Sequence, residues 1–208
     1  YTPGTLTIGA AQLTTDGLTA TITYGETATD AVFAGKMKNG AGEEVDGTFA
    51  WANAGAVQPL TVEASGTEYD VVFTPDNTTY YLPATVKGTL IVNPVAITVT
   101  ACDTNMLVKC ETPEFKYKVT SGALVGDDEL VGTLCTTDTL TVGTHDIVRA
   151  NDWNNPNYDI TFVKGTLTVR AGKVTVNGKG YDDVAAAMAD VTSNGGTAVF
   201  NEEVDSAP

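Results

Sequence analysis

The side chains with the greatest potential for chemistry in this sequence are one histidine and three cysteines. His145 is the only histidine, and Cys102, Cys110 and Cys135 all lie between residues 95 and 170. Nucleophilic catalysis needs a hydroxyl or thiol beside an imidazole that a carboxylate orients, and no local signature of such a site surrounds Cys135. His145 shares strand parity with Ile147, so we expect it to fill a partly buried position in a sheet. The sequence therefore predicts a protein that is not an enzyme and has no catalytic residues.

The cysteines leave three interpretations open. They are buried small apolar residues, or two of them form one structural disulfide that includes Cys110, or they bind a metal. An odd number permits at most one internal bridge, and the spacing does not choose a pairing. Metal binding has the least support, because no Cys-x-x-Cys spacing occurs and His145 stands alone.

Carboxylates dominate the charge of the chain. Lys plus Arg is 11 against 26 Asp plus Glu, which gives a net charge of −15. This field repels phosphate backbones and anionic bilayers, so we expect neither a nucleic-acid partner nor direct membrane binding. Loops that carry Asp103, Asp127, Asp128 and Asp152 offer the oxygen ligands that calcium prefers, although solvated turns with no cofactor are the default.

Two aromatic residues are candidates for ligand contact. Trp153 and Tyr80 lie in or next to turns, where rings can be displayed for stacking on a sugar. The alternative is that each ring packs over the end of a module. We therefore keep a host or environmental glycan or protein as an expected partner, beside the neighbouring modules of the same chain.

A repeated segment organises the chain. Val163–Val169 is a near copy of Val86–Val92, and a fragment, Gly4–Ile8, opens the sequence. The glycines lie at 4, 88 and 165, so the spacings are 88 − 4 = 84 and 165 − 88 = 77 residues, the size of a small β-domain. The expected organisation is residues 1–9 as the terminal strand of a preceding module, 10–94 and 95–170 as two modules, and 171–208 as a strand–helix–strand start of a further region. We expect the cut strand Gly4–Ile8 to add to an available sheet edge.

Alternation of apolar and polar residues predicts strands in both modules. In the first module it runs through Leu18–Tyr24 and Tyr69–Phe73, and the rings of Phe49 and Trp51 should anchor the core. Lys36–Gly47 is predicted to be a turn-rich connection. Pro94 in a short linker predicts that the modules sit end to end as a semi-rigid rod.

The pattern changes after Arg170. Tyr181, Val184, Met188 and Val191 recur at helical spacing, which predicts an amphipathic helix. Asp182 is the expected N-cap, and Asn194-Gly195-Gly196 the expected stop. This piece is too short to form its own core, so it leans on the second module or opens a domain that continues.

Family resemblance adds to this interpretation. Ile97-Thr98-Val99-Thr100-Ala101, Val142-Gly143-Thr144-His145-Asp146-Ile147 and Ile160–Leu167 closely resemble the MBG repeats of bacterial surface adhesins, in which a Tyr-Gly pair usually follows the first strand and Lys109-Cys110 stands in its place here. Residues 20–92, with Ile22-Thr23-Tyr24-Gly25 and Gly47-Thr48-Phe49-Ala50-Trp51, look like a related Ig-like repeat. Residues 173–204 are similar to the opening segment of β-helix regions in such proteins.

These resemblances imply an architecture and a location. We expect a mainly β chain of two tandem small β-domains, Ig-like sandwiches or β-grasp-like, with a short strand–helix–strand appendage. The implied function is a non-catalytic repeat region of a bacterial surface protein, extracellular, acting as a semi-rigid stalk or adhesive module. The alternative is a carbohydrate-binding accessory module of a secreted enzyme.

Overall fold

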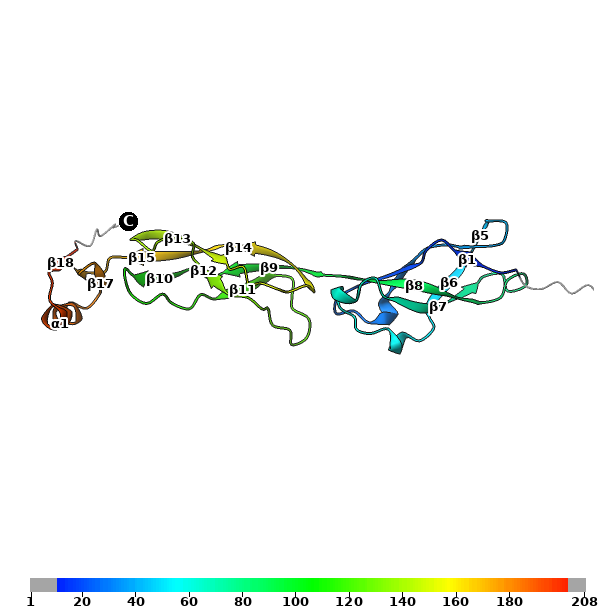
Figure 1. Ribbon diagram of the computed structural model, residues 1–208, viewed down its shortest axis with the longest axis horizontal. Helices are drawn as coiled ribbons and strands as arrows, with labels where there is room; N and C mark the ends of the chain where they lie inside the picture. The colour runs from blue at the N-terminus through cyan, green and yellow to red at the C-terminus, as the bar shows by residue number, and fades with distance from the viewer. Residues whose placement is uncertain (1–10, 202–208) are drawn as a thin grey trace, which may run out of the picture. The chain divides into compact units, whose positions relative to one another are not determined.

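The protein is mainly β, as the sequence predicts, with 44% of residues in strands and 10% in helices. The computed structural model describes residues 11–201 (Figure 1). The expected strand Gly4–Ile8 and its pairing with a sheet edge lie outside these residues. The chain divides into two compact units: the first runs to Val95 and includes 125–127 and 156–159, and the second takes the rest. No helix in the described part is long and apolar enough to cross a bilayer.

The first unit is built on a five-stranded sheet of order β3-β2-β8-β7-β6. Its strands are β2 (Thr19–Thr23), β3 (Val32–Ala34), β6 (Gly47–Trp51), β7 (Glu68–Pro75) and β8 (Ala84–Asn93). A smaller sheet holds β1 (Thr14–Thr15), β4 (Met37–Lys38) and β5 (Glu44–Val45). Three short 3-10 turns complete the unit, at Ala28–Asp30, Ala54–Ala56 and Val62–Ala64.

The core of the first unit confirms the predicted alternation. Along β2 the apolar residues are buried while the threonines between them are half-exposed. The predicted aromatic anchors are also confirmed: Trp51 is buried, and its Nε1–H donates to the carbonyl of Ala28 at 2.8 Å. The ring of Phe49 packs at a tilt against that of Phe73, with ring centroids 5.0 Å apart.

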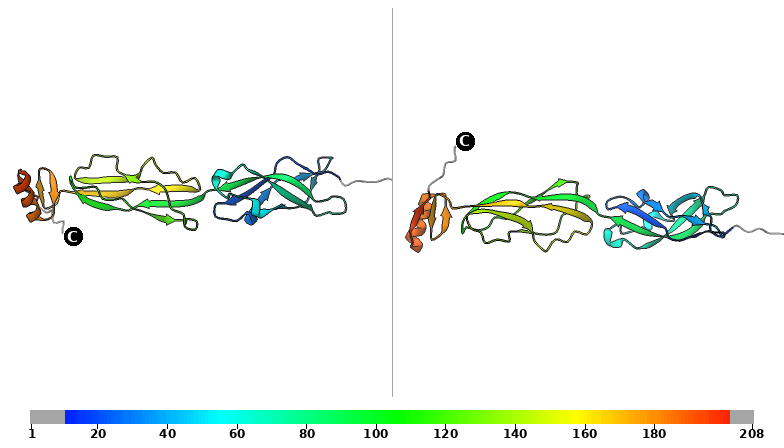
Figure 2. Two further views of the ribbon diagram at one scale, coloured as in Figure 1. Left: turned by 60° about the horizontal axis from the view of Figure 1, so that its bottom comes forward. Right: turned by 90° about the horizontal axis from the view of Figure 1, so that it is seen from above.

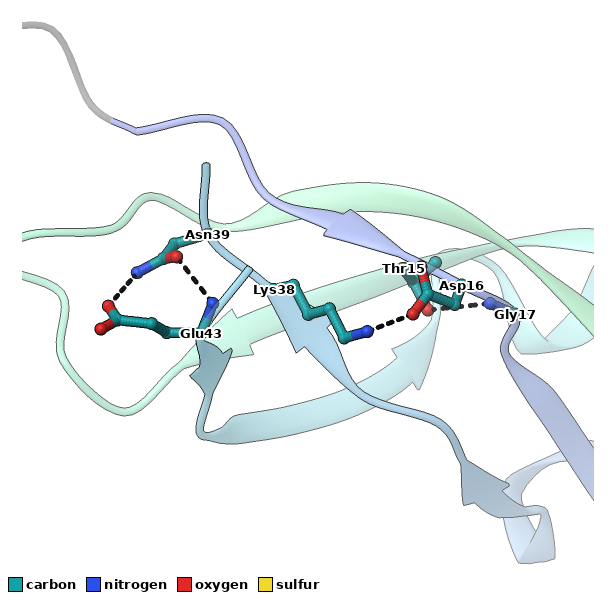
Figure 3. Close-up of polar contacts among 6 residues, drawn as sticks. All are labelled: Thr15, Asp16, Gly17, Lys38, Asn39 and Glu43. Atoms are coloured by element: carbon teal, nitrogen blue, oxygen red, sulfur yellow. Dashed lines mark hydrogen bonds and ion pairs between the residues drawn. The ribbon is translucent and has the colours of Figure 1, made fainter. Parts of the chain in front are cut away.

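The predicted connection Lys36–Gly47 contains a short β4–β5 hairpin that the turn-rich composition concealed. Asn39 organises its turn, because its side-chain oxygen accepts from the amides of Ala41 and Glu43, both at 3.0 Å. The amide nitrogen of Asn39 donates to the Glu43 carboxylate, and an ion pair joins Lys38 to Asp16 at the end of β1 (Figure 3). Local side-chain hydrogen bonds thus add to the short ladder that two-residue strands can form.

The second unit contains two sheets besides the C-terminal one described below. One has the order β10-β15-β13-β12, and its strands are β10 (Thr104–Leu107), β12 (Leu134–Cys135), β13 (Gly143–Arg149) and β15 (Gly165–Arg170). The other has the order β11-β9-β14, with β9 (Val95–Ala101), β11 (Tyr117–Ser121) and β14 (Tyr158–Val163). The buried cluster in this unit consists of Ala101, Met106, Ile147, Leu167 and Val169.

Both units close in the same way. In each unit the repeated segment forms a strand that pairs in parallel with an early strand: β8 with β2, and β15 with β10. The residue after each early strand adds one more hydrogen bond to the ladder. The amide of Tyr24 donates to the carbonyl of Asn93 at 2.9 Å, and the amide of Val108 donates to the carbonyl of Arg170 at 2.8 Å.

This equivalence corrects one sequence assignment. Tyr24 corresponds to Val108, so the place of the Tyr-Gly pair is held by Val108-Lys109 rather than by Lys109-Cys110. The torsion angles agree, because Gly25 has φ of 93° and Lys109 has φ of 58°. Lysine at a left-handed position carries a backbone cost that glycine avoids.

The glycine of the repeated segment is required by packing. A Cβ on Gly88 would lie 2.7 Å from Cγ2 of Val71, and one on Gly165 would lie 2.7 Å from the carbonyl oxygen of Ala101. Real Cβ atoms do not approach neighbours so closely. The recurrence of this residue therefore reflects a tight contact at the same point in both units.

The C-terminal piece is a sheet of order β17-β16-β18 covered by α1 on one face (Figure 2). The elements are β16 (Val174–Val176), β17 (Lys179–Tyr181), α1 (Val184–Asn194) and β18 (Ala198–Phe200). Contrary to the expectation that it forms no core, it buries Val174, Val176 and Ala187 together. It also contacts the rest of the second unit, since the amide of Gly180 donates to the carbonyl of Val108 at 2.9 Å.

The helix α1 differs from the prediction in its N-cap and in its buried face. Its N-cap is Asp183, whose side chain accepts from the amide of Ala185 at 2.8 Å, whereas Asp182 forms an ion pair with Arg170. The buried stripe is centred on Ala187, while Met188, predicted on the inner face, is 46% exposed. The small alanine lets α1 approach its sheet closely, which the spacing of larger residues did not indicate.

Candidate functional site

The segment 131–133 of the second unit is held by side chains rather than by a regular ladder. Asn155 binds both peptide groups of Val131, since its Oδ1 accepts from the amide and its Nδ2 donates to the carbonyl, each at 2.8 Å. Asp152 accepts from the amide of Thr133 at 3.0 Å and from its hydroxyl at 2.8 Å. The loop 151–155 therefore acts as a clamp that fixes an extended segment in front of β12.

Asp152, a sequence candidate for calcium, serves in this clamp. The backbone amide of Thr133, followed by its hydroxyl, lowers the pKa of the Asp152 carboxyl below its ordinary value. A carboxylate that accepts two such hydrogen bonds is stabilised in its charged form.

Trp153 is packed into the same region. Its Nε1–H donates to the carbonyl of Thr133 at 2.6 Å, and its ring makes edge contacts with Tyr117 and Phe162 at centroid distances of 5.5 and 5.9 Å. Gly132 leaves room for the ring, because a Cβ there would overlap it. The indole thus connects the clamped segment at Thr133 to the rings of Tyr117 on β11 and Phe162 on β14.

A groove of about 420 Å³ opens beside this cluster. One wall is formed by the residues that lead into β11, and the other by the clamped segment that leads into β12. The residues of the first wall are Thr112, Pro113, Glu114, Phe115 and Tyr117, and those of the second are Gly132, Thr133 and Leu134. The hydroxyl of Tyr117 reaches the carbonyl of Leu130 at 3.5 Å. The groove combines half-buried apolar side chains with one carboxylate.

Sequence reasoning did not single out these lining residues. Residue type alone indicated Trp153 and Asp152. Both hold Thr133, which lines the groove, and neither lines the groove itself. Glycine at 132 and proline at 113 are the only signals in the sequence, and neither indicates a cavity without the fold. Asp152 and Trp153 are neighbours in the sequence and both hydrogen-bond to Thr133, whereas Tyr80 lies in the first unit and is 70% exposed.

The remaining calcium candidates are dispersed. Asp103 accepts from the amide of Thr166 at 2.7 Å, Asp127 is exposed, and Asp128 is half-buried. Across residues 11–201, no three or more His, Cys, Asp or Glu side chains gather in a group that could hold a metal ion.

His145 and the cysteines occupy structural positions. His145 is 9% exposed on β13 opposite Leu167, and its Nε2 lies 2.7 Å from the carbonyl oxygen of Thr141. Because a carbonyl only accepts, Nε2 carries a proton and the other nitrogen faces the Asp138 carboxylate at 3.8 Å. The three cysteines are half-buried free thiols, and Cys110 contacts the carbonyl of Gly180.

The comparison with protein families concerns the unit that contains this groove. Residues 97–168 match the family model of the MBG domain (YGX type), which is consistent with an MBG-type module in this part of the chain. The match indicates a repeat module of a surface protein, and this family is typically non-catalytic. None of the curated proteins matches the chain.

Proposed function

We propose that the chain is a non-catalytic repeat region of a bacterial surface protein, displayed outside the cell as a semi-rigid stalk or adhesive module. The MBG match supports a surface-protein module, and the repeated closing strand supports an array of such modules. The net charge of −15 keeps such a region soluble and away from anionic surfaces.

The observation that carries the stalk role is the parallel pairing that closes each unit. Chain tension would pull β2 by its N-terminal end and β8 by its C-terminal end, in opposite directions along one axis. Because the two strands are parallel, this load shears all of their hydrogen bonds at once instead of opening them one by one. In the second unit β15 is likewise parallel to β10, and the load reaches β10 through β9, which belongs to the other sheet.

Single-molecule stretching of the full chain between terminal handles tests this role. We expect two main unfolding events, each releasing a module of about 80 residues at about 3.3–3.6 Å per residue, or roughly 260–290 Å before the folded length is subtracted.

Handles at Glu68 and Asn93 supply the control, because they load the antiparallel β7–β8 pair from one end and peel it bond by bond. Terminal stretching should require clearly more force than this peeling. Equal forces would show that the parallel closure bears no special load and would remove the support for a stalk.

Surface display has its own test. Antibodies against the purified chain should label intact cells that express the full protein. Labelling only after permeabilisation would contradict the proposed location.

A further inference from the structure

Within the part of the chain that the structure describes, the groove of the second unit is bounded by two backbone edges whose outward peptide groups have no partner. Along the clamped wall, Val131 and Thr133 direct their peptide groups away from the groove: the amide of Val131 donates to Asn155, and the carbonyl of Thr133 accepts from Ala150 at 3.0 Å. Peptide groups alternate in direction along an extended chain. Those of Gly132 and Leu134 therefore face the groove that these residues line.

The opposite wall shows the same arrangement. The amide of Cys102 donates to the carbonyl of Lys116 at 2.7 Å, so Lys116 faces β9 and the peptide groups of Phe115 and Tyr117 point the other way. Before Lys116, the backbone of residues 112–115 makes no hydrogen bond to any part of the chain that the structure describes. Two edges, each with free donors and acceptors, thus line one groove.

We propose that this groove accepts an extended polypeptide strand from a partner protein. A peptide backbone presents donors and acceptors at the repeat of an extended edge, and strand addition to a sheet edge satisfies them. The half-buried side chains of Phe115, Tyr117 and Leu134 would receive small apolar residues at alternate positions of the guest strand.

Charge narrows the choice of guest. Glu114 is the only charged residue that lines the groove, and Glu111 lies just before it on a chain of net charge −15. A guest strand with lysine or arginine near the groove complements this field, and an acidic strand does not. Strand capture goes beyond the stalk role, since a chain that served only as a spacer would need no such groove.

Amide hydrogen exchange on the full chain tests the proposal directly. The probe is a blocked peptide of alternating threonine and valine with lysine at both ends. In the free protein, the amides of Gly132, Leu134 and Tyr117 should exchange readily, while that of Val148, which pairs with β12, is protected. At a peptide concentration of about ten times Kd, exchange at the three groove amides should slow by about tenfold, because only the unbound fraction exchanges.

Two matched controls separate strand pairing from unspecific binding. The same peptide with N-methyl groups on alternate amides should lose this protection. Glu114→Lys should weaken binding of the unmodified peptide by about three- to fivefold, the range of a surface charge pair, while Glu111→Lys outside the groove should have a smaller effect. Both glutamates are exposed, so neither substitution disturbs the core.

Several results would overturn the proposal. They are no protection by any form of the peptide, equal protection by the N-methylated form, or equal effects of the two charge reversals. Protection of the same amides by cellopentaose but not by the peptide would assign the groove to a glycan and would also refute strand capture. None of these results bears on surface display or on the stretching experiment.

Discussion

Gly132 lines the groove and packs against the ring of Trp153. Replacing Gly132 by alanine is therefore the most informative perturbation of this region. Its φ of 148° lies in a region that L-residues rarely adopt, which costs about 1–3 kcal/mol. A Cβ at this position would also overlap the ring of Trp153, and overpacking costs a further 1–3 kcal/mol. We expect Gly132→Ala to destabilise the second unit by about 2–6 kcal/mol.

Gly143 provides a matched control for this substitution. Its φ of 140° imposes nearly the same backbone strain, but an added Cβ there meets nothing within 4 Å. Gly143→Ala should therefore cost only the strain, about 1–3 kcal/mol. The difference between the two variants isolates the overlap with Trp153.

Urea denaturation of the full chain, followed through the NMR signal of Ile147 in the core of the second unit, measures both free energies of unfolding. The difference should shrink when Trp153 is replaced by leucine, which vacates the space. If Gly132→Ala costs no more than Gly143→Ala, within about 0.5 kcal/mol, the packing of Trp153 against this glycine is refuted.

Three further predictions concern other contacts. Trp51→Phe retains a ring but removes the indole N–H that donates to the carbonyl of Ala28, which keeps its longer bond from the amide of Ala31 at 3.3 Å, so the free energy of unfolding of the first unit should fall by about 0.5–1.5 kcal/mol in a urea titration; an unchanged midpoint would contradict this. Gly165→Ala should cost about 1–3 kcal/mol, because the obstructing atom is a backbone oxygen, and a thermal melt without a shift in Tm would disprove it. The lowered pKa of Asp152 stabilises the fold at pH values above the ordinary carboxyl pKa, and this contribution is lost as pH falls through the lower pKa of the folded state. From about pH 5 to pH 2, the free energy of unfolding of the native protein should therefore fall by more than that of Asp152→Asn. Parallel curves of unfolding free energy against pH for the two proteins would contradict this.

Much of the fold was predictable because it depends on local patterns. Alternation located β2 and β7, since one face of each strand enters a core and the other meets solvent. The repeated Gly-Thr-Leu segment identified the closing strand of each unit, because a close neighbour leaves no room for a side chain at either glycine. The failures were also local: Asn39 builds a hairpin through side-chain bonds, and Asp183 rather than Asp182 caps α1.

The candidate site was only partly predictable. Residue type alone singled out Asp152 and Trp153, but not that both turn toward Thr133. Their partners lie about twenty positions away along the chain, and no periodic pattern links positions so far apart. Phe115 and Gly132, on opposite walls of the groove, became neighbours only through folding.

By itself, the sequence determined the class of architecture and the repeated closure of the units, because hydrophobic periodicity and a glycine at a crowded position act within short stretches of chain. Tertiary structure alone decided the groove. Its two free edges exist because β11 and β12 belong to different sheets and no strand of the described chain lies between them to satisfy their outward peptide groups. Sheet order is set by long-range pairing, and the direction of an unpaired amide has no signature in the residues that carry it.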